Sequence, residues 1–137
     1  MKRMRCLVLE PGYYPYVSMF QNLDDMIEQL WEEPVEITLP FDNNVITLIY
    51  QDNQIGLPHN RVFGDSQNIG GRAVICGWDG KQMIGLTKAQ ANRYYRRFLY
   101  PEQVEETTDG KVVSPCPNPK NKPMDERFGK KPNWLER

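Results

Sequence analysis

Histidine and cysteine are scarce in this sequence of 137 residues, and their scarcity removes several kinds of chemistry. His59 is the one histidine, so any acid–base, nucleophilic or metal chemistry that needs an imidazole must use it. Cys6, Cys76 and Cys116 form no close pair along the chain, which argues against a disulfide framework or a zinc knuckle. We therefore predict no metal site and no cofactor. Because Cys6 and Cys76 each lie in an apolar run, we expect them in neighbouring central strands as buried, unbonded thiols.

Long apolar runs and an excess of one charge are also missing. No apolar segment approaches the roughly 20 residues that cross a bilayer, and the run at residues 6–9 is too short for a signal peptide. Seventeen basic against eighteen acidic residues give a net charge of -1, so unspecific nucleic-acid binding would need a local basic patch. These features predict a protein with one modest core, located in the cytoplasm and without membrane contact.

Hydrophobic periodicity predicts two helices. Asn22 is a candidate N-cap for a helix whose apolar residues recur at helical spacing until Pro34 stops it. Thr87 is the candidate cap of a second helix, which runs to about Leu99 and is closed by Pro101. The residues expected on the inner side of the second helix are Ala91, Tyr94, Tyr95 and Phe98.

Short β-branched runs predict strands at residues 5–9, 35–41, 45–50 and 72–76, with a further short one at 83–84. The second and third runs flank an Asp-Asn-Asn turn and should form a hairpin. Because strands and helices do not alternate strictly, we predict an α+β fold. Its expected form is a mostly antiparallel sheet of about four to five strands with both helices on one face.

Composition changes near Pro101, where six of the eleven prolines begin to gather in the last 37 residues. We predict a single α+β domain at residues 1–100 and a proline-rich, extended tail at 101–137, docked on the domain or on a partner. Residues 114–119 should be extended or polyproline-like. The candidate anchors of the tail are Met124, Phe128 and the pair Trp134 and Leu135.

Several motifs occur together between residues 5 and 99. The most specific is Gly-Leu-Pro-His-Asn-Arg at 56–61, and the others are Glu-Pro-Gly at 10–12 with Pro-Tyr at 15–16, Leu-Pro-Phe-Asp at 39–42, and Ile-Gly-Gly at 69–71. Together they resemble the small phage and mobile-element proteins grouped as domain of unknown function 3846. The resemblance implies a phage-like genetic setting and an unassigned activity rather than an enzyme, and it gives His59 no special role.

The turn at 56–61 holds the strongest candidate site. Asn60 and Arg61 offer a carbonyl, an amide and a planar guanidinium fork, which suit a carboxylate, a phosphate or a backbone edge. Such residues beside a Gly/Pro turn also tie loops down by bonding backbone carbonyls. His59, with no partner at catalytic spacing, is expected to be a dispensable surface or capping residue.

The loop after the first strand carries three tyrosines, Tyr13, Tyr14 and Tyr16. Amphipathic rings in a loop can form a recognition surface. Half-buried rings that cover the edge of the sheet are the alternative interpretation, and the sequence leaves both open.

The two predicted helices carry opposite charge. Asp24, Asp25, Glu28, Glu32 and Glu33 give the first helix an acidic face that can mimic phosphates or be an ordinary solvated surface. Basic residues interleaved with aromatic ones in the last helix resemble a nucleic-acid surface, although the helix dipole and core spacing explain the same pattern. These basic residues are Lys88, Arg93, Arg96 and Arg97.

We therefore favour a non-enzymatic phage or mobile-element protein that binds a macromolecular partner in the bacterial cytoplasm. The expected partner is a bacterial protein or nucleoprotein complex of defence or nucleic-acid processing, which the protein inhibits in the manner of an anti-CRISPR or other anti-defence protein. One alternative is a nucleic-acid-binding protein that uses the last helix. The other is a binder of a nucleotide-like small molecule at residues 56–61.

Overall fold

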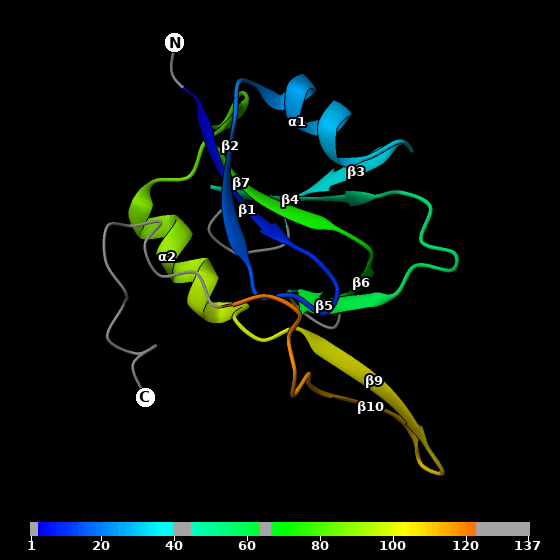
Figure 1. Cartoon of the computed structure of the whole chain (residues 1–137). Helices are drawn as coiled ribbons and strands as arrows, with labels where there is room; N and C mark the ends of the chain where they lie inside the picture. Colours follow the sequence, from blue (N-terminus) through cyan, green and yellow to red (C-terminus); the bar gives the residue numbers. More distant parts are fainter. Residues whose placement is uncertain (1–2, 40–44, 64–66, 123–137) are drawn as a thin grey trace.

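One antiparallel sheet organises the chain (Figure 1). The structure is a computed structural model that describes residues 3–39, 45–63 and 67–122. The main sheet has six strands in the order β2-β1-β7-β4-β3, with β8 paired to β7, and every pair is antiparallel. The strands are β1 (Met4–Leu9), β2 (Tyr16–Phe20), β3 (Val35–Thr38), β4 (Ile46–Gln51), β7 (Ala73–Trp78) and β8 (Met83–Ile84). With its two helices the described chain has the predicted α+β fold.

Helices α1 (Leu23–Leu30) and α2 (Lys88–Arg97) cover opposite faces of this sheet. In β1, Cys6 and Val8 belong to the cluster beneath α1, whereas Leu7 and Leu9 belong to the cluster beneath α2. The expectation that both helices lie on one face is wrong. The physical reason is that the central strands are apolar on both faces, so each face needs a cover.

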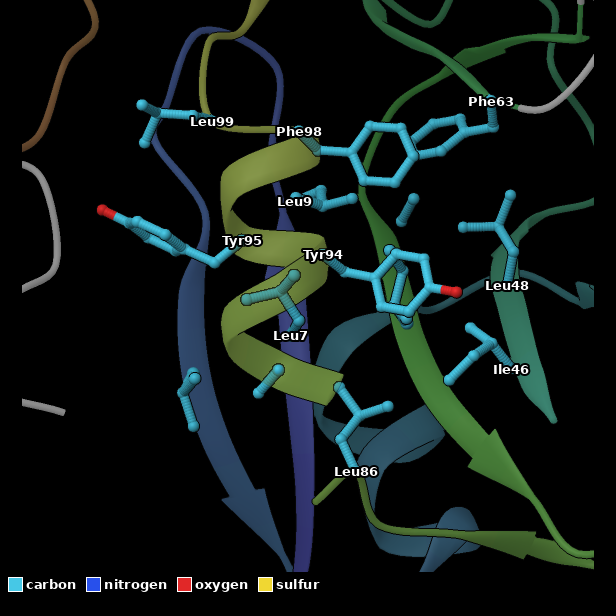
Figure 2. Close-up of a cluster of buried hydrophobic side chains, with 14 of the residues drawn as sticks. Leu7, Leu9, Ile46, Leu48, Phe63, Leu86, Tyr94, Tyr95, Phe98 and Leu99 are labelled. Atoms are coloured by element: carbon cyan, nitrogen blue, oxygen red, sulfur yellow. The ribbon is translucent and has the colours of Figure 1, made fainter. Parts of the chain in front are cut away.

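The core beneath α2 is built around its aromatic residues. Figure 2 shows Tyr94 directed towards Ile46 and Leu48 of β4, with Phe98 beside Phe63. The centroids of the Phe63 and Phe98 rings lie 4.9 Å apart in a tilted arrangement. This confirms that Ala91, Tyr94, Tyr95 and Phe98 form the inner side of the helix.

Both predicted helix N-caps are confirmed. Asn22 Oδ1 accepts the Asp25 N–H at 2.8 Å, and Thr87 Oγ1 accepts the Gln90 N–H at 3.0 Å. Helix α1 ends earlier than expected, with Trp31 as an extended C-cap. Glu32 and Glu33 therefore lie in the turn after α1 and not in its last turn, because Pro34 disfavours helix in the residues before it.

Within residues 1–100, three strands were missed by the sequence analysis. Strand β2 pairs with β1 where only a loop was expected, so Tyr16 begins a strand. Strands β5 (His59–Phe63) and β6 (Gln67–Gly70) form a separate two-stranded sheet. Asn60 and Arg61 thus lie in a strand instead of a turn. The strand was not predicted because residues 59–63 lack the usual alternation of apolar and polar residues.

The segment after Pro101 forms a β-hairpin of β9 (Glu102–Thr107) and β10 (Gly110–Pro115). The extended tail of the sequence analysis is therefore a paired ribbon over these residues, and the expected polyproline-like stretch begins inside β10. Gly110 has a φ of 123°, a backbone conformation that residues with a side chain rarely adopt. The anchors proposed at residues 124, 128, 134 and 135 lie outside the described residues.

Neither α1 nor α2 has the length and apolar character needed to cross a bilayer.

Candidate functional site

Arg61 lies at the centre of a buried polar cluster. Its side chain is 1% exposed, and its guanidinium donates from Nε to the Phe98 carbonyl at 2.8 Å and from Nη2 to the Tyr13 carbonyl at 2.6 Å. Nη1 donates to the Glu10 carbonyl at 3.3 Å and to Asn60 Oδ1 at 2.6 Å. One side chain on β5 thus joins the loop after β1 to the end of α2.

The charge of Arg61 is compensated mainly by carbonyl groups. The Phe98 carbonyl belongs to the C-cap of α2, where the helix dipole is negative. Burial lowers the pKa of Arg61 to about 10, and the nearby Glu102 carboxylate acts in the opposite direction. The group therefore stays protonated at neutral pH, held by groups of the fold itself.

Asn60 completes this cluster. Its side chain is fully buried, and Nδ2 donates to the Leu9 carbonyl and to the Gly71 carbonyl, both at 2.8 Å. Both amide hydrogens of Asn60 and four of the five N–H groups of Arg61 are therefore engaged within the protein. In this arrangement Asn60 and Arg61 hold loops in place by bonding backbone carbonyls, which is the structural alternative given above for the 56–61 segment.

A second polar group, which the sequence analysis missed, surrounds Glu10 at the end of β1. Arg72 Nη2 donates to Glu10 Oε1 at 2.9 Å, and the Tyr16 hydroxyl donates to Oε2 at 2.6 Å. Arg72 Nη1 also donates to the Leu30 carbonyl at the end of α1, at 2.6 Å. The sequence signal for this group was the position of the two charged residues beside motifs. Glu10 is the first residue of the Glu-Pro-Gly motif, and Arg72 directly follows Gly70 and Gly71.

His59 has a partner that the sequence analysis did not find. Its Nε2 lies 3.0 Å from Glu102 Oε1, which also accepts the Val62 N–H at 2.9 Å. Sequence spacing gave no sign of this carboxylate, because it lies 43 residues away on β9, which runs beside β5. Among the described residues no group of three or more His, Cys, Asp or Glu side chains could hold a metal ion.

The tyrosine loop is covered by the segment after β10. Asn121 Oδ1 accepts the Tyr14 N–H at 2.7 Å, and Asn121 Nδ2 donates to the Tyr14 carbonyl at 3.2 Å. The Lys120 N–H donates to the Gly12 carbonyl at 2.8 Å, and Lys120 Nζ lies 5.6 Å from the centre of the Tyr13 ring. The loop with Tyr13 and Tyr14 therefore binds residues 120–121 of the same chain.

The first helix and the turn after it carry an exposed acidic surface, which we define as Asp24, Glu28, Glu32 and Glu33. Asp25 does not contribute to it, because its two carboxylate oxygens accept the Gln21 N–H and a Gln29 side-chain N–H. Within the described part of the chain, no cation forms an ion pair with the acidic surface. These carboxylates face solvent on the α1 side of the molecule.

The basic residues of α2 lie on the other side of the sheet. Lys88, Arg93, Arg96 and Arg97 are all exposed. The guanidinium carbon of Arg93 is 6.0 Å from the centre of the Tyr94 ring, and that of Arg97 is 5.2 Å from the Phe98 ring. Because the aromatic residues between them are buried, they cannot stack on nucleic-acid bases.

Cys6 and Cys76 are fully buried on the neighbouring strands β1 and β7, as predicted. Both are free thiols, with their Sγ atoms 3.2 Å apart and in hydrogen-bond contact. The bond to Cys6 and burial raise the pKa of Cys76 well above its ordinary value. The pair belongs to the core beneath α1, where Met26 Sδ lies 3.9 Å from Cys76 Sγ.

Residues 4–99 match the model of one protein family, described as Domain of unknown function (DUF3846). The match spans most of the chain, from β1 to the end of α2, and includes both polar clusters. The chain therefore belongs to this family. No curated protein and no solved structure matches it.

Proposed function

We propose that this protein acts by binding a macromolecular partner, and that the acidic surface on α1 and the following turn makes the contact. The observation that carries the proposal is a contrast between two sets of polar residues. Arg61, Asn60 and Glu10 are bonded to other parts of the same chain. Glu28, Glu32 and Glu33 are exposed, without an ion-pair partner among the described residues.

The chemistry of the acidic surface indicates the kind of partner. Clustered carboxylates attract a basic surface at long range and speed its approach. The grooves of nucleic-acid-handling proteins are basic because they bind phosphates, and carboxylates spaced along a helix and turn can take the place of those phosphates. We therefore propose a bacterial defence or nucleic-acid-processing complex as the partner, with inhibition of that complex as the effect. The phage or mobile-element setting of this role rests on the motif resemblance.

An apolar element lies next to the acidic surface along the chain. The turn with Glu32 and Glu33 leads into the edge strand β3. Ile37 in this strand and Leu39 directly after it are 42% and 43% exposed. Ile37 is opposite Ile49, a member of the cluster beneath α1, so it lies on the α1 side of the sheet. Exposed apolar area beside charged groups can add affinity to the steering that the carboxylates supply.

The two rival functions have weaker support. A nucleotide-like ligand at 56–61 would have to compete with backbone carbonyls for the donors of Asn60 and Arg61. Nucleic-acid binding through α2 has four exposed cations in its favour, but the aromatic rings that lie among them, Tyr94, Tyr95 and Phe98, are buried. Direct nucleic-acid binding therefore serves as the alternative outcome of the test.

The test is affinity capture from a bacterial lysate followed by mass spectrometry. Wild-type protein is compared with a variant that carries Glu28→Gln, Glu32→Gln and Glu33→Gln, and with a matched variant that carries Arg93→Gln, Arg96→Gln and Arg97→Gln. We expect one stoichiometric partner with the wild type and the arginine variant, and its loss with the glutamate variant. Capture of nucleic acid that depends on the arginines would overturn the proposal.

A further inference from the structure

The β9–β10 hairpin extends away from the rest of the chain (Figure 1). It exposes three valines along its length, with Val104, Val112 and Val113 at 37%, 48% and 41% exposure. Its base is held where Glu102 accepts the Val62 N–H and the Cys116 N–H donates to the Pro101 carbonyl. Among the described residues no further strand pairs with this ribbon. A two-stranded ribbon alone is only marginally stable in water, so this hairpin gains from a further strand.

The two edges of the hairpin differ in charge. Strand β9 carries Glu102, Glu105 and Glu106, and its base lies beside β5. Strand β10 carries a single charged residue, Lys111, together with Val112 and Val113. Charged side chains protect an edge strand from pairing, so β9, with three carboxylates, is better protected than β10, with one ammonium group. The edge of β10 is therefore the more open of the two.

The backbone of β10 is oriented for pairing at this open edge. The hydrogen bond from Cys116 to Pro101 makes these two residues a hydrogen-bonded pair of the antiparallel ladder. Hydrogen-bonded pairs alternate with non-hydrogen-bonded pairs along the ladder. The non-hydrogen-bonded pairs therefore include Val113 with Val104 and Lys111 with Glu106. The N–H and C=O groups of Lys111 and Val113 therefore point away from β9.

We propose that β10 pairs with β10 of a second copy of this chain, antiparallel and about a two-fold axis at Val113. The result is one four-stranded sheet in the order β9-β10-β10-β9. The two Val113 residues exchange N–H···O=C bonds at the axis, and each Lys111 N–H donates to the Pro115 carbonyl of the other copy. Val104 and Val113 of both copies then form a continuous row on one face, which is the self-complementary contact of a two-fold dimer.

Charge favours this edge over the other one. In the proposed sheet the two β9 strands are three strand spacings apart, roughly 14 Å, which exceeds the screening length of about 8 Å at physiological ionic strength. Pairing through β9 about Val104 would instead place Glu102 of each copy opposite Glu106 of the other, at about 5 Å. Like charges directly opposite each other destabilise a pair of strands.

The first test is sedimentation of the full chain over a range of concentrations. We expect a dimer, and we expect Val113→Lys to raise its dissociation constant by at least about 10-fold, because two ammonium groups meet at the axis. Ile55→Lys makes the same chemical change at an 89% exposed residue outside the hairpin and should leave the dimer unchanged. A wild-type monomer, or a dimer that Val113→Lys does not weaken, overturns the proposal.

The second test fixes the register by oxidative cross-linking in a Cys116→Ser background. Val113→Cys should give a covalent dimer, because the two residues meet at the axis. Val104→Cys should give none, because its two copies are too far apart for a disulfide. Cross-linking through residue 104, or failure of cross-linking through residue 113, would contradict the pairing. Neither test involves the acidic surface, so their results are independent of the proposed function.

Discussion

His59 Nε2 lies 3.0 Å from Glu102 Oε1, and this contact joins the family domain to the segment that follows it. The same oxygen accepts the Val62 N–H, so a single carboxylate fastens the base of β9 to β5. The two side chains are only 17% and 27% exposed, which shields the contact from solvent. The hairpin thus has a firm base on the domain, while its valines farther along remain exposed.

Replacing Glu102 should weaken this attachment. We expect Glu102→Ala to lower the free energy of unfolding by about 1–2 kcal/mol, because the Val62 N–H loses its acceptor in a half-buried position. Urea denaturation measures the loss, and hydrogen exchange at Val62 should accelerate. Glu106→Ala, at an exposed position of the same strand, is the control and should stay within about 0.5 kcal/mol. Equal effects of the two substitutions would show that Glu102 does not anchor the hairpin.

Arg61 should be a structural residue of large effect. Arg61→Met removes the guanidinium donors of the buried Phe98 carbonyl and of the partly buried Tyr13 carbonyl, so we expect a loss of about 3 kcal/mol or more in unfolding free energy. Arg61→Lys should recover only part of this, because an ammonium cannot reproduce the planar fork. The exposed Arg93→Met is the control and should cost little. A loss below about 1 kcal/mol for Arg61→Met would refute the structural role.

The buried thiols predict both a labelling pattern and a pH dependence. Under native conditions Cys116, which is partly exposed, should react quickly with a thiol reagent, while Cys6 and Cys76 react slowly. The pKa of Cys76 in the folded protein is raised above the ordinary value of 9.0. When the pH rises past 9.0, the thiol of the unfolded chain therefore loses its proton before the thiol of the folded chain does. Stability from this group is therefore complete below about pH 9 and declines as the pH rises.

Cys76→Val removes this titration and is the matched test. The variant should lose less stability than the wild type between neutral pH and pH values above about 9. Denaturation at several pH values makes the comparison. Rapid native labelling of both Cys6 and Cys76, or parallel pH profiles for the two proteins, would contradict the account of the pair.

His59 should not be essential for partner binding. Its contact with Glu102 supports the hairpin. When His59 is replaced, Glu102 can still accept the hydrogen bond from the Val62 N–H. We expect His59→Ala to change partner affinity by no more than a few-fold. A loss of order 100-fold or more in activity would instead indicate general acid–base chemistry and restore an enzymatic function.

Local signals in the sequence were sufficient for some elements. Asn22 and Thr87 were recognised as N-caps because a cap acts within its own helical turn. The β9–β10 hairpin also had such a signal, since the Asp-Gly pair at 109–110 is typical of a tight hairpin turn. It was missed because the proline content of the tail favoured an extended conformation.

Long-range relationships could not be predicted in this way. The pairing of His59 with Glu102 and the burial of Arg61 depend on which segments the fold brings together. The local sequence around Arg61 is compatible both with a turn residue and with a buried guanidinium at the centre of a polar cluster. The faces of the two helices were misassigned for a related reason, because a strand such as β1 is apolar on both faces and does not show which helix covers which side.

The central claim is that the acidic surface makes the contact with the partner. Its most direct test is the association rate with the captured partner at several salt concentrations. We expect Glu28→Gln, Glu32→Gln and Glu33→Gln together to slow association and flatten its salt dependence. Stability should change little, because these side chains are exposed and form no ion pair with any described residue. Arg93→Gln, Arg96→Gln and Arg97→Gln together should leave the rate nearly unchanged. If the arginine variant loses binding and the glutamate variant keeps it, the claim is wrong and nucleic-acid binding through α2 becomes the better account.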